Sequence, residues 1–215
     1  SILQKLNNFW SFLMVASILS MSLFSLIMSV SPGPVNLIAL SIGARTGFSS
    51  ALPFVLGATS GFTLLLIVVG LGLYGLTSAL PVVRFTLVLV GAVYLLYLGR
   101  LIYLAEPVVT DHTVASKGFL SGALLQWLNP KAWSACAGGV AMFELAGSAS
   151  KLWLFVALYA PICFLGIGAW AGLGAGLRNR QLPAWAMRRL NQLLGLCLMA
   201  LALLLVVNQL LERMA

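Results

Sequence analysis

Two proline-containing motifs, Ser31-Pro32-Gly33-Pro34 and Leu128-Asn129-Pro130-Lys131, interrupt hydrophobic segments about half a chain length apart. Each segment is otherwise apolar enough to cross a membrane. Proline ends the helical hydrogen-bond pattern and leaves backbone N–H and C=O groups unpaired, and hydrocarbon offers them no partner. Such breaks therefore occur where protein or a watery cavity surrounds them, and a matched pair is typical of a transporter's substrate site.

The composition indicates that lipid surrounds most of the chain. Of the 215 residues, 61% are hydrophobic and only 7% are charged, whereas a soluble domain carries about a quarter charged residues. The net charge of +8 comes from basic residues in short connections, where they orient the protein and meet anionic headgroups. The sequence has no basic stripe of the kind that binds nucleic acid. We predict an integral membrane protein whose partner is the lipid bilayer.

Six apolar segments are long enough to cross the hydrocarbon core, which takes about 20 helical residues. They are roughly Phe12–Ile42, Ala51–Ser78, Pro81–Leu104, Gly118–Phe143, Leu152–Leu177 and Leu190–Leu211. The first would measure about 46 Å as one straight helix, which exceeds the bilayer core, so its length alone predicts a break near Pro32. The connections are too short for a separate domain, and we expect one all-α transmembrane domain over residues 1–215.

Division of the chain near Ala115 gives two halves, about residues 12–104 and 118–211, with three spans in each. The first span of each half carries the proline break. Because three crossings reverse the direction of the chain, the second half enters the membrane upside down, which predicts the 3+3 inverted repeat of alternating-access carriers. Seven Lys and Arg residues lie in the odd-numbered connections and four on the other side, which favours both termini outside.

The residues around the breaks are suited to bind an anion. Asn129 is a favoured N-cap and Pro130 a favoured first helical residue, and Pro34 can likewise open a half-helix after Gly33. Two half-helices that begin near mid-membrane would direct N–H groups and positive dipole ends at one site, which can hold a carboxylate. The predicted substrate-binding residues are Ser31, Pro32, Gly33, Pro34, Asn36, Gln126, Asn129, Pro130 and Lys131.

Lys131 directly follows the second break. An ammonium near the bilayer centre costs about 2.5 kcal/mol or more, so its side chain should face a cavity or a partner. Two interpretations are open: Lys131 contacts the carboxylate of a substrate, or it binds carbonyl groups freed at the broken end of the preceding half-helix. The other polar side chains beside the breaks are Asn36, Gln126 and Asn129, with Ser29, Ser31 and Ser134 as lesser candidates.

Several chemistries have no support in the sequence. Cys136, Cys163 and Cys197 lie inside apolar segments without a CxxC pair, so buried thiols are favoured over a disulfide or a metal site. The sequence has no GxxxxGK[ST] loop for ATP. Its single histidine, His112, lies in a polar connection, so a hydrolase would have no base within the membrane. We expect a protein that is not an enzyme and that binds no metal.

Four groups of residues resemble the LysE/RhtB superfamily of bacterial amino-acid exporters. They are Ser31-Pro32-Gly33-Pro34; Gly43, Gly47, Gly57 and Gly61; Gly91-Ala92-Val93-Tyr94-Leu95 with Leu98-Gly99; and Gln126-Trp127-Leu128-Asn129-Pro130-Lys131-Ala132. The resemblance extends roughly from Met21 to Leu205. It implies an inner-membrane exporter that exchanges small amino acids for protons and holds no tightly bound cofactor. The RhtB branch, which handles homoserine, threonine, cysteine and related neutral compounds, is the more similar one.

One departure from the family pattern concerns proton coupling. Some relatives carry a carboxylate within the fifth span, where this chain reads Tyr159-Ala160-Pro161-Ile162-Cys163. The acidic residues Glu106, Asp111, Glu144 and Glu212 all lie at or beyond the ends of the predicted spans. Glu144 is the candidate coupling residue. A site without a buried carboxylate also argues against a strongly cationic substrate.

Two alternatives stay open. A membrane thiol–disulfide electron-transfer protein of related fold would need a cysteine near each break, and the first broken span has none.

Glycines at Gly57/Gly61 and Gly168/Gly172/Gly176 have the spacing that lets helices approach closely. Packing within the subunit is the favoured interpretation of these glycines, with a homodimer as the alternative.

Overall fold

In the computed structural model, every regular element is a helix within the residues that it describes, namely 2–73, 81–104, 118–145, 148–179 and 183–214. The helices are α1 (Ile2–Val30), α2 (Pro34–Thr46), α3 (Phe48–Val68) with its π-helical extension η1 (Val69–Leu73), α5 (Pro81–Tyr103), α7 (Phe119–Trp127), α8 (Pro130–Met142), α9 (Ala149–Asn179) and α10 (Ala184–Met214). The predicted all-α class is confirmed for these residues. His112 lies outside them.

Three helices in the described part of the chain are long and apolar enough to cross a membrane. They are Phe48–Gly72, Ala149–Arg178 and Ala184–Leu204. The bent pair Met14–Val30 and Pro34–Thr46 makes a fourth when it is counted as one span. α5 contributes a shorter apolar stretch, Ala92–Tyr103, and α7 and α8 are individually too short to span. The protein is therefore a multi-pass membrane protein, and the arrangement of six spans stays a prediction.

Both breaks lie at the predicted motifs. α1 ends at Val30 and α2 begins at Pro34, with a bend of 59° between the two helices. α7 ends at Trp127 and α8 begins at Pro130. Each new helix thus has proline in its first turn, where the missing N–H costs no hydrogen bond. The predicted interruption of the first and fourth apolar segments is confirmed.

The helices extend further than the apolar segments from which they were predicted. α1 begins at Ile2 rather than near Phe12, and α10 begins at Ala184 rather than near Leu190. The predicted bounds followed the change from apolar to polar residues. Polar and basic residues do not end a helix by themselves, so the helical backbone continues past the apolar core of each segment.

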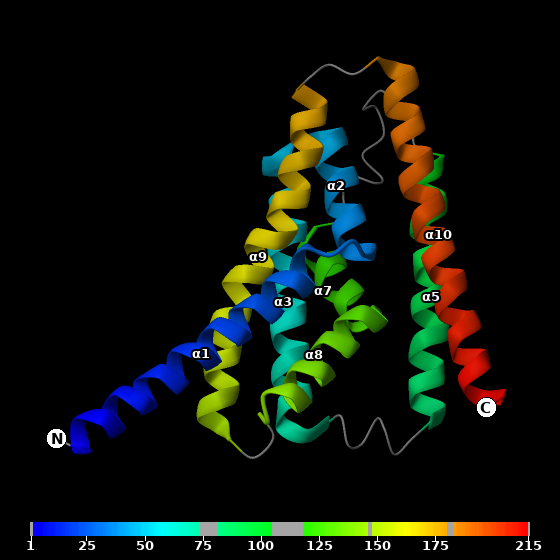
Figure 1. Ribbon diagram of the computed structural model, residues 1–215. Coiled ribbons are helices and arrows are strands. Elements are labelled where there is room, and N and C mark those ends of the chain that lie inside the picture. The colour runs from blue at the N-terminus through cyan, green and yellow to red at the C-terminus, as the bar shows by residue number, and fades with distance from the viewer. Residues whose placement is uncertain (1, 74–80, 105–117, 146–147, 180–182, 215) are drawn as a thin grey trace.

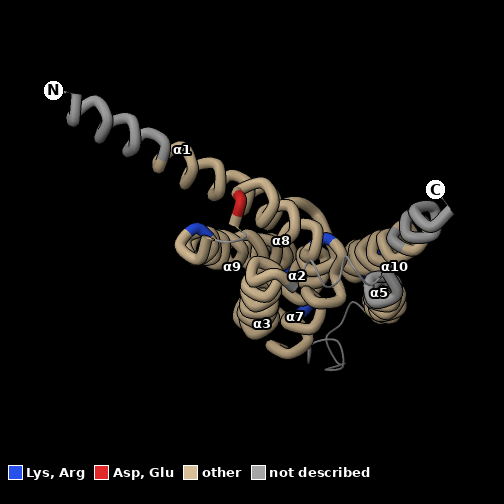
Figure 2. Tube along the Cα trace, turned by 90° about the horizontal axis from the view of Figure 1, so that it is seen from below, with Lys and Arg blue, Asp and Glu red and all other residues tan. Residues whose placement is uncertain are grey.

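α3 and α9 lie side by side, away from α5 and α10 (Figures 1 and 2). α9 packs along α1, α2 and α3, and α3 also packs along α7. Glycines make these contacts close: a Cβ on Gly57 would overlap the backbone of Phe119, and one on Gly61 would lie 2.6 Å from the Ala123 carbonyl oxygen. The predicted packing of these two glycines within the subunit is therefore confirmed. Gly168 and Gly176 have no atom of the described residues within 4 Å of such a Cβ.

α5 and α10 form a pair beside the other helices (Figures 1 and 2). Their backbones meet at Gly99, where a Cβ would lie 2.8 Å from the Gly195 carbonyl oxygen. α10 also contacts α2, which connects the pair to the rest of the molecule.

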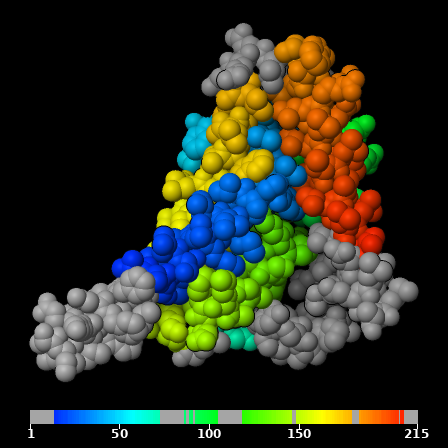
Figure 3. Space-filling model, viewed as in Figure 1, coloured from blue at the N-terminus to red at the C-terminus, as the bar shows by residue number. Residues whose placement is uncertain are grey.

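Large apolar side chains are exposed along the helices, as expected for surfaces that face lipid. On α1, Met14, Val15 and Leu19 are all more than half exposed. Figure 3 shows the described part of this helix (blue) running along α9 (yellow) and above α8 (light green). Its other end leads into the first break, so α1 carries the chain from the lipid-facing surface to the interior.

Candidate binding site at the two helix breaks

The second break is capped by residues close to it in sequence. The side-chain Oδ1 of Asn129 accepts a hydrogen bond from the Lys131 backbone N–H at 3.1 Å, as predicted for an N-cap. The Asn129 carbonyl accepts from the N–H groups of Ala132 and Trp133 at 2.9 and 3.3 Å. Across the break, Trp133 Nε1 donates to the Trp127 carbonyl at 2.7 Å. Local partners therefore occupy much of the free backbone at this break.

The first break has no comparable cap. α2 begins at Pro34 after the extended residue Gly33, and no side chain caps its first turn. Its backbone pairing begins with the Leu37 N–H, which donates to the Gly33 carbonyl at 3.0 Å. The N–H groups of Val35 and Asn36 precede that bond and lie at the positive end of the α2 dipole. The start of α2 is thus better placed than the start of α8 to offer N–H groups to an anion.

Side chains from elsewhere in the fold pair the carbonyl groups at the end of α1. Asn36 Nδ2 donates to the carbonyl oxygens of Ser29 and Ser31 at 2.8 and 3.0 Å. Trp170 Nε1, from α9, donates to the Val30 carbonyl at 2.9 Å. These carbonyl groups lie at the negative end of α1, which attracts donors and cations. The amide nitrogen of Asn36 is therefore engaged in holding the first break together.

Lys131 extends from the second break to the first. Its Nζ lies 2.6 Å from the Ser31 carbonyl oxygen and 3.4 Å from that of Pro32. The side chain passes over Gly33, where a Cβ would lie 3.0 Å from Lys131 Cδ and 3.2 Å from Nζ. Of the two interpretations, carbonyl binding by Lys131 is seen, but the carbonyl groups lie after α1 in the other half rather than on the preceding half-helix. The ammonium joins the breaks of the two halves, and its contact with a substrate carboxylate stays a prediction.

A cavity of about 40 Å³ lies between the two breaks. It is lined by Met28, Ser29, Gly33, Val35, Asn36, Phe62, Gln126, Asn129, Lys131, Ala132, Ala135, Tyr159, Cys163 and Ile167. Such a volume holds about three water molecules. An amino acid is several times larger than water, so the helices must separate before one can enter.

The structure brings most of the predicted site residues together. Gly33, Asn36, Gln126, Asn129 and Lys131 line the cavity, and the three amide side chains are each only 4% exposed. The other predicted residues contribute through the backbone. Ser31 and Pro32 supply carbonyl groups to the Lys131 ammonium. Pro34 and Pro130 are the first residues of α2 and α8.

Three polar lining residues were not among the predicted site. Tyr159 and Cys163 lie on α9, and Ser29, a lesser candidate in the sequence, lies near the end of α1 with a buried hydroxyl that has no partner in the described residues. The Tyr159 ring is held between Phe62, with ring centroids 4.4 Å apart, and Phe155 at 5.4 Å. The four-residue spacing of Tyr159 and Cys163 places both on one helix face. That spacing was the available signal, but nothing in the sequence says which face of α9 meets the breaks.

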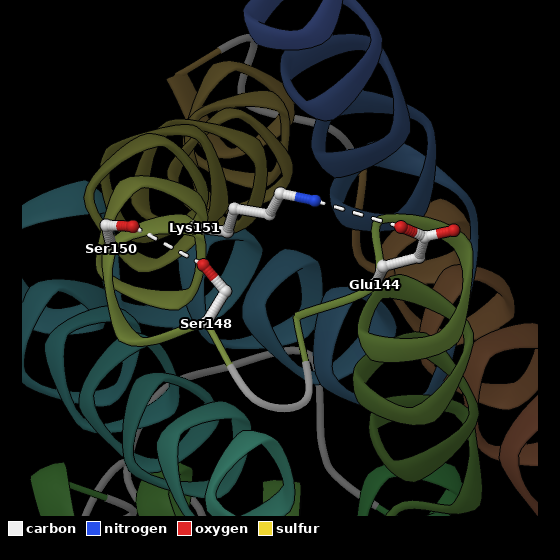
Figure 4. A network of polar contacts seen from close by, with 4 residues as sticks. All are labelled: Glu144, Ser148, Ser150 and Lys151. Atoms are coloured by element: carbon white, nitrogen blue, oxygen red, sulfur yellow. Dashed lines mark hydrogen bonds and ion pairs between the residues drawn. The ribbon is translucent and has the colours of Figure 1, made fainter.

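Glu144 lies away from the cavity, at the end of α8 (Figure 4). Its side chain is 86% exposed, and its carboxylate lies 3.8 Å from Lys151 Nζ at the start of α9. Its backbone has a φ of 51°, an uncommon value for a residue with a side chain. The hydroxyls of Ser148 and Ser150 lie 3.3 Å apart beside this ion pair. The coupling role of Glu144 stays a prediction.

The three cysteines are free thiols. Cys136 and Cys163 are buried as predicted, but Cys197 is exposed, so the expectation of a buried thiol is wrong at that position. α10 buries one face against α5, and Cys197 lies on another. In the described residues, no group of three or more His, Cys, Asp and Glu side chains lies close enough together to hold a metal ion.

A family model described as LysE type translocator matches residues 26–209. The match covers most of the chain and includes both breaks and every residue that lines the cavity. Comparison with curated proteins and with solved structures found no match.

Proposed function

Because the chain belongs to the LysE type translocator family, we propose that it is a secondary active exporter of small neutral amino acids or their close derivatives. Homoserine, threonine and cysteine represent the substrate class. Members of this family are transporters rather than enzymes. The proposed location is the inner membrane of a bacterium, with both termini outside.

One observation carries the proposal: a cavity that is lined by the two helix breaks and contains one ammonium, that of Lys131. This ammonium and the uncapped start of α2 suit a substrate carboxylate. The described lining residues include no carboxylate. A lysine or arginine substrate would bring a second positive charge with no fixed anion to balance it, which favours a neutral substrate.

The polar groups that α1 and α9 contribute to the cavity favour a small polar side chain on the substrate. Ser29, Tyr159 and Cys163 contribute two hydroxyls and a thiol to its lining. A hydroxyl or thiol on the substrate could exchange hydrogen bonds with these groups. A site of this kind rejects an aliphatic analogue because its buried polar groups would be left unpaired.

We propose that the two halves form an inverted repeat that moves around this cavity. In that repeat α1, α2, α3 and α5 correspond to α7, α8, α9 and α10. Two contacts then join helices to their own counterparts, α3 with α9 and α5 with α10, and the contact of α3 with α7 corresponds to that of α9 with α1. Both ends of the chain also lie at the same end of the molecule (Figure 1), as an even number of crossings requires.

Proton coupling is proposed at Glu144. Protonation would remove the charge that attracts Lys151 and would free the end of α8 from the start of α9. Because α8 begins at the second break, movement of α8 after protonation of Glu144 would change the cavity that this break lines. The variant Glu144→Gln removes this charge: its flux should no longer respond to a pH gradient, while exchange of labelled for unlabelled substrate continues. Gradient-driven flux equal to wild type would exclude the role.

The experiment that tests the function is uptake of labelled amino acids by liposomes that contain the purified protein, with and without an imposed pH gradient. The panel is threonine, homoserine, cysteine, O-acetylserine, leucine, lysine and arginine. We expect saturable flux of a neutral polar member that increases with the gradient, and little flux of lysine or arginine. Absence of flux for every member, from protein shown to be folded, would contradict the proposal.

A further inference from the structure

The Ser31 and Pro32 carbonyl oxygens form a binding position for an ammonium group. They lie at the negative end of α1, and the proline break prevents the following residues from donating helical hydrogen bonds to them. Lys131 Nζ occupies this position, at 2.6 and 3.4 Å from the two oxygens.

Lys131 differs from the other donors at the end of α1. Asn36, which donates to the Ser29 and Ser31 carbonyl groups, and Trp170, which donates to that of Val30, are neutral. Lys131 is charged, reaches the oxygens through a flexible stem and lines the cavity. Its contact with Pro32 is long for a hydrogen bond between an ammonium and an oxygen. It is therefore the donor that a charged ligand can draw away.

An amino acid brings a carboxylate and an ammonium together. A carboxylate is a stronger partner for Lys131 than a neutral carbonyl group is, because both members of the pair are charged. Once Lys131 turns towards it, the Pro32 oxygen loses this donor and the Ser31 oxygen keeps only the neutral amide of Asn36. The ammonium of the same ligand can restore that pairing.

We propose that the Ser31 and Pro32 carbonyl oxygens are the subsite for the substrate's ammonium, and that Lys131 Nζ occupies this subsite when no substrate is bound. The substrate carboxylate pairs with the displaced Lys131 beside the start of α2. The inference rests on the proposed function and adds how the site recognises the amino-acid backbone. A ligand must carry both groups: an amine alone does not attract Lys131, and a carboxylate alone leaves the two oxygens without a charged donor.

Binding to purified protein in lipid nanodiscs, measured by isothermal titration calorimetry, tests the exchange. The probes are L-threonine, L-homoserine and the amino alcohol of each, which keeps the ammonium and lacks the carboxylate. Wild type should bind the amino acids and bind the amino alcohols at least about tenfold more weakly. In Lys131→Ala the position of the ammonium is vacant, so binding of the amino alcohols should tighten about tenfold relative to wild type, because a competing occupant has been removed.

The control is Arg100→Ala, which removes one positive charge from an exposed position at the end of α5. It should bind all four probes as wild type does. Lys131→Met, which keeps an apolar stem over Gly33, replaces the alanine variant if the latter does not stay monodisperse, and the same gain is expected.

A gain of amine binding cannot come from misfolding, so it supports the exchange directly. If wild type binds the amino acids and neither Lys131 variant gains affinity for the amino alcohols, the subsite is excluded while the proposed function stands. If wild type binds no amino acid of the transport panel, the proposed function fails and the subsite with it.

Discussion

The two helix breaks share a proline in the first turn of the following helix but pair their free backbone groups in different ways. At the second break the partners are local: Asn129 caps the Lys131 N–H, and Trp133 binds the Trp127 carbonyl six residues away. At the first break the donors come from three helices, α2, α8 and α9. The second break therefore keeps its own shape, whereas the first depends on the positions of the helices around it.

This difference indicates which break changes during transport. A break with local hydrogen bonds can move as a unit when α7 and α8 move. The first break must exchange partners when α8 or α9 shifts, because Lys131 and Trp170 lie on those helices. In the proposed mechanism the second break is a rigid support and the first is the part that responds to substrate.

Lys131→Ala removes the group that joins the breaks and has the largest expected effect. Transport of threonine in proteoliposomes should fall by about 100-fold or more, because truncation of one partner of a buried charge pair costs about 2–5 kcal/mol. Arg100→Ala should transport normally. A Lys131→Ala protein with wild-type flux would show that the two breaks work independently of this ammonium.

Asn36→Ser tests how strongly the first break depends on the side-chain amide of Asn36 in α2. A serine hydroxyl is shorter and has one donor, so it cannot replace both hydrogen bonds from Asn36 Nδ2. We expect a loss of about 1–3 kcal/mol in the free energy of unfolding, the typical cost of a buried polar group left unpaired. The measurement is denaturant or thermal unfolding of the purified protein, and a change below about 0.5 kcal/mol would contradict it.

The same substitution at the second break should be mild. Serine is a good N-cap, so Asn129→Ser should keep the acceptor for the Lys131 N–H and change stability little. Asn129→Ala lacks the acceptor and should cost about 1 kcal/mol. Equal losses for Asn36→Ser and Asn129→Ser would mean that the breaks do not differ as described.

Replacement of all three cysteines by alanine has the smallest expected effect on transport. Neither break contains a cysteine, and the thiols are free. Flux should stay within about twofold of wild type, because a thiol is a weak hydrogen-bonding group and loss of the Cys163 thiol from the cavity lining removes little binding energy. Complete loss of flux from folded protein would instead favour the thiol–disulfide alternative.

Much of the fold could be predicted from local chemistry. Pro34 and Pro130 open helices because proline lacks an N–H that the first turn does not need, and Asn129 caps because its side chain reaches the next turn. These effects depend only on residues close together in the chain, so they can be predicted from the sequence. Helix ends were less accurate, because the lipid boundary and the end of a helix are set by different forces.

Sequence analysis predicted only those residues of the candidate site that lie close to a break in the sequence. Lys131 and the amides were found because polar residues beside a break are conspicuous in an apolar segment. Neither of the two interpretations of Lys131 included its contact with the Ser31 carbonyl, which joins residues 100 positions apart. The position of Tyr159 in the cavity lining was not predicted, again because it depends on contacts between distant parts of the chain. The rotation of α9 is set by close packing against α2 and α3, which no short sequence pattern encodes.

A crystal structure with bound L-threonine would test most directly whether the two breaks form one substrate site. The predicted result is a carboxylate about 3 Å from Lys131 Nζ, with the threonine ammonium at the Ser31 and Pro32 carbonyl oxygens. Threonine bound elsewhere, with Lys131 still on the Ser31 carbonyl, would contradict it.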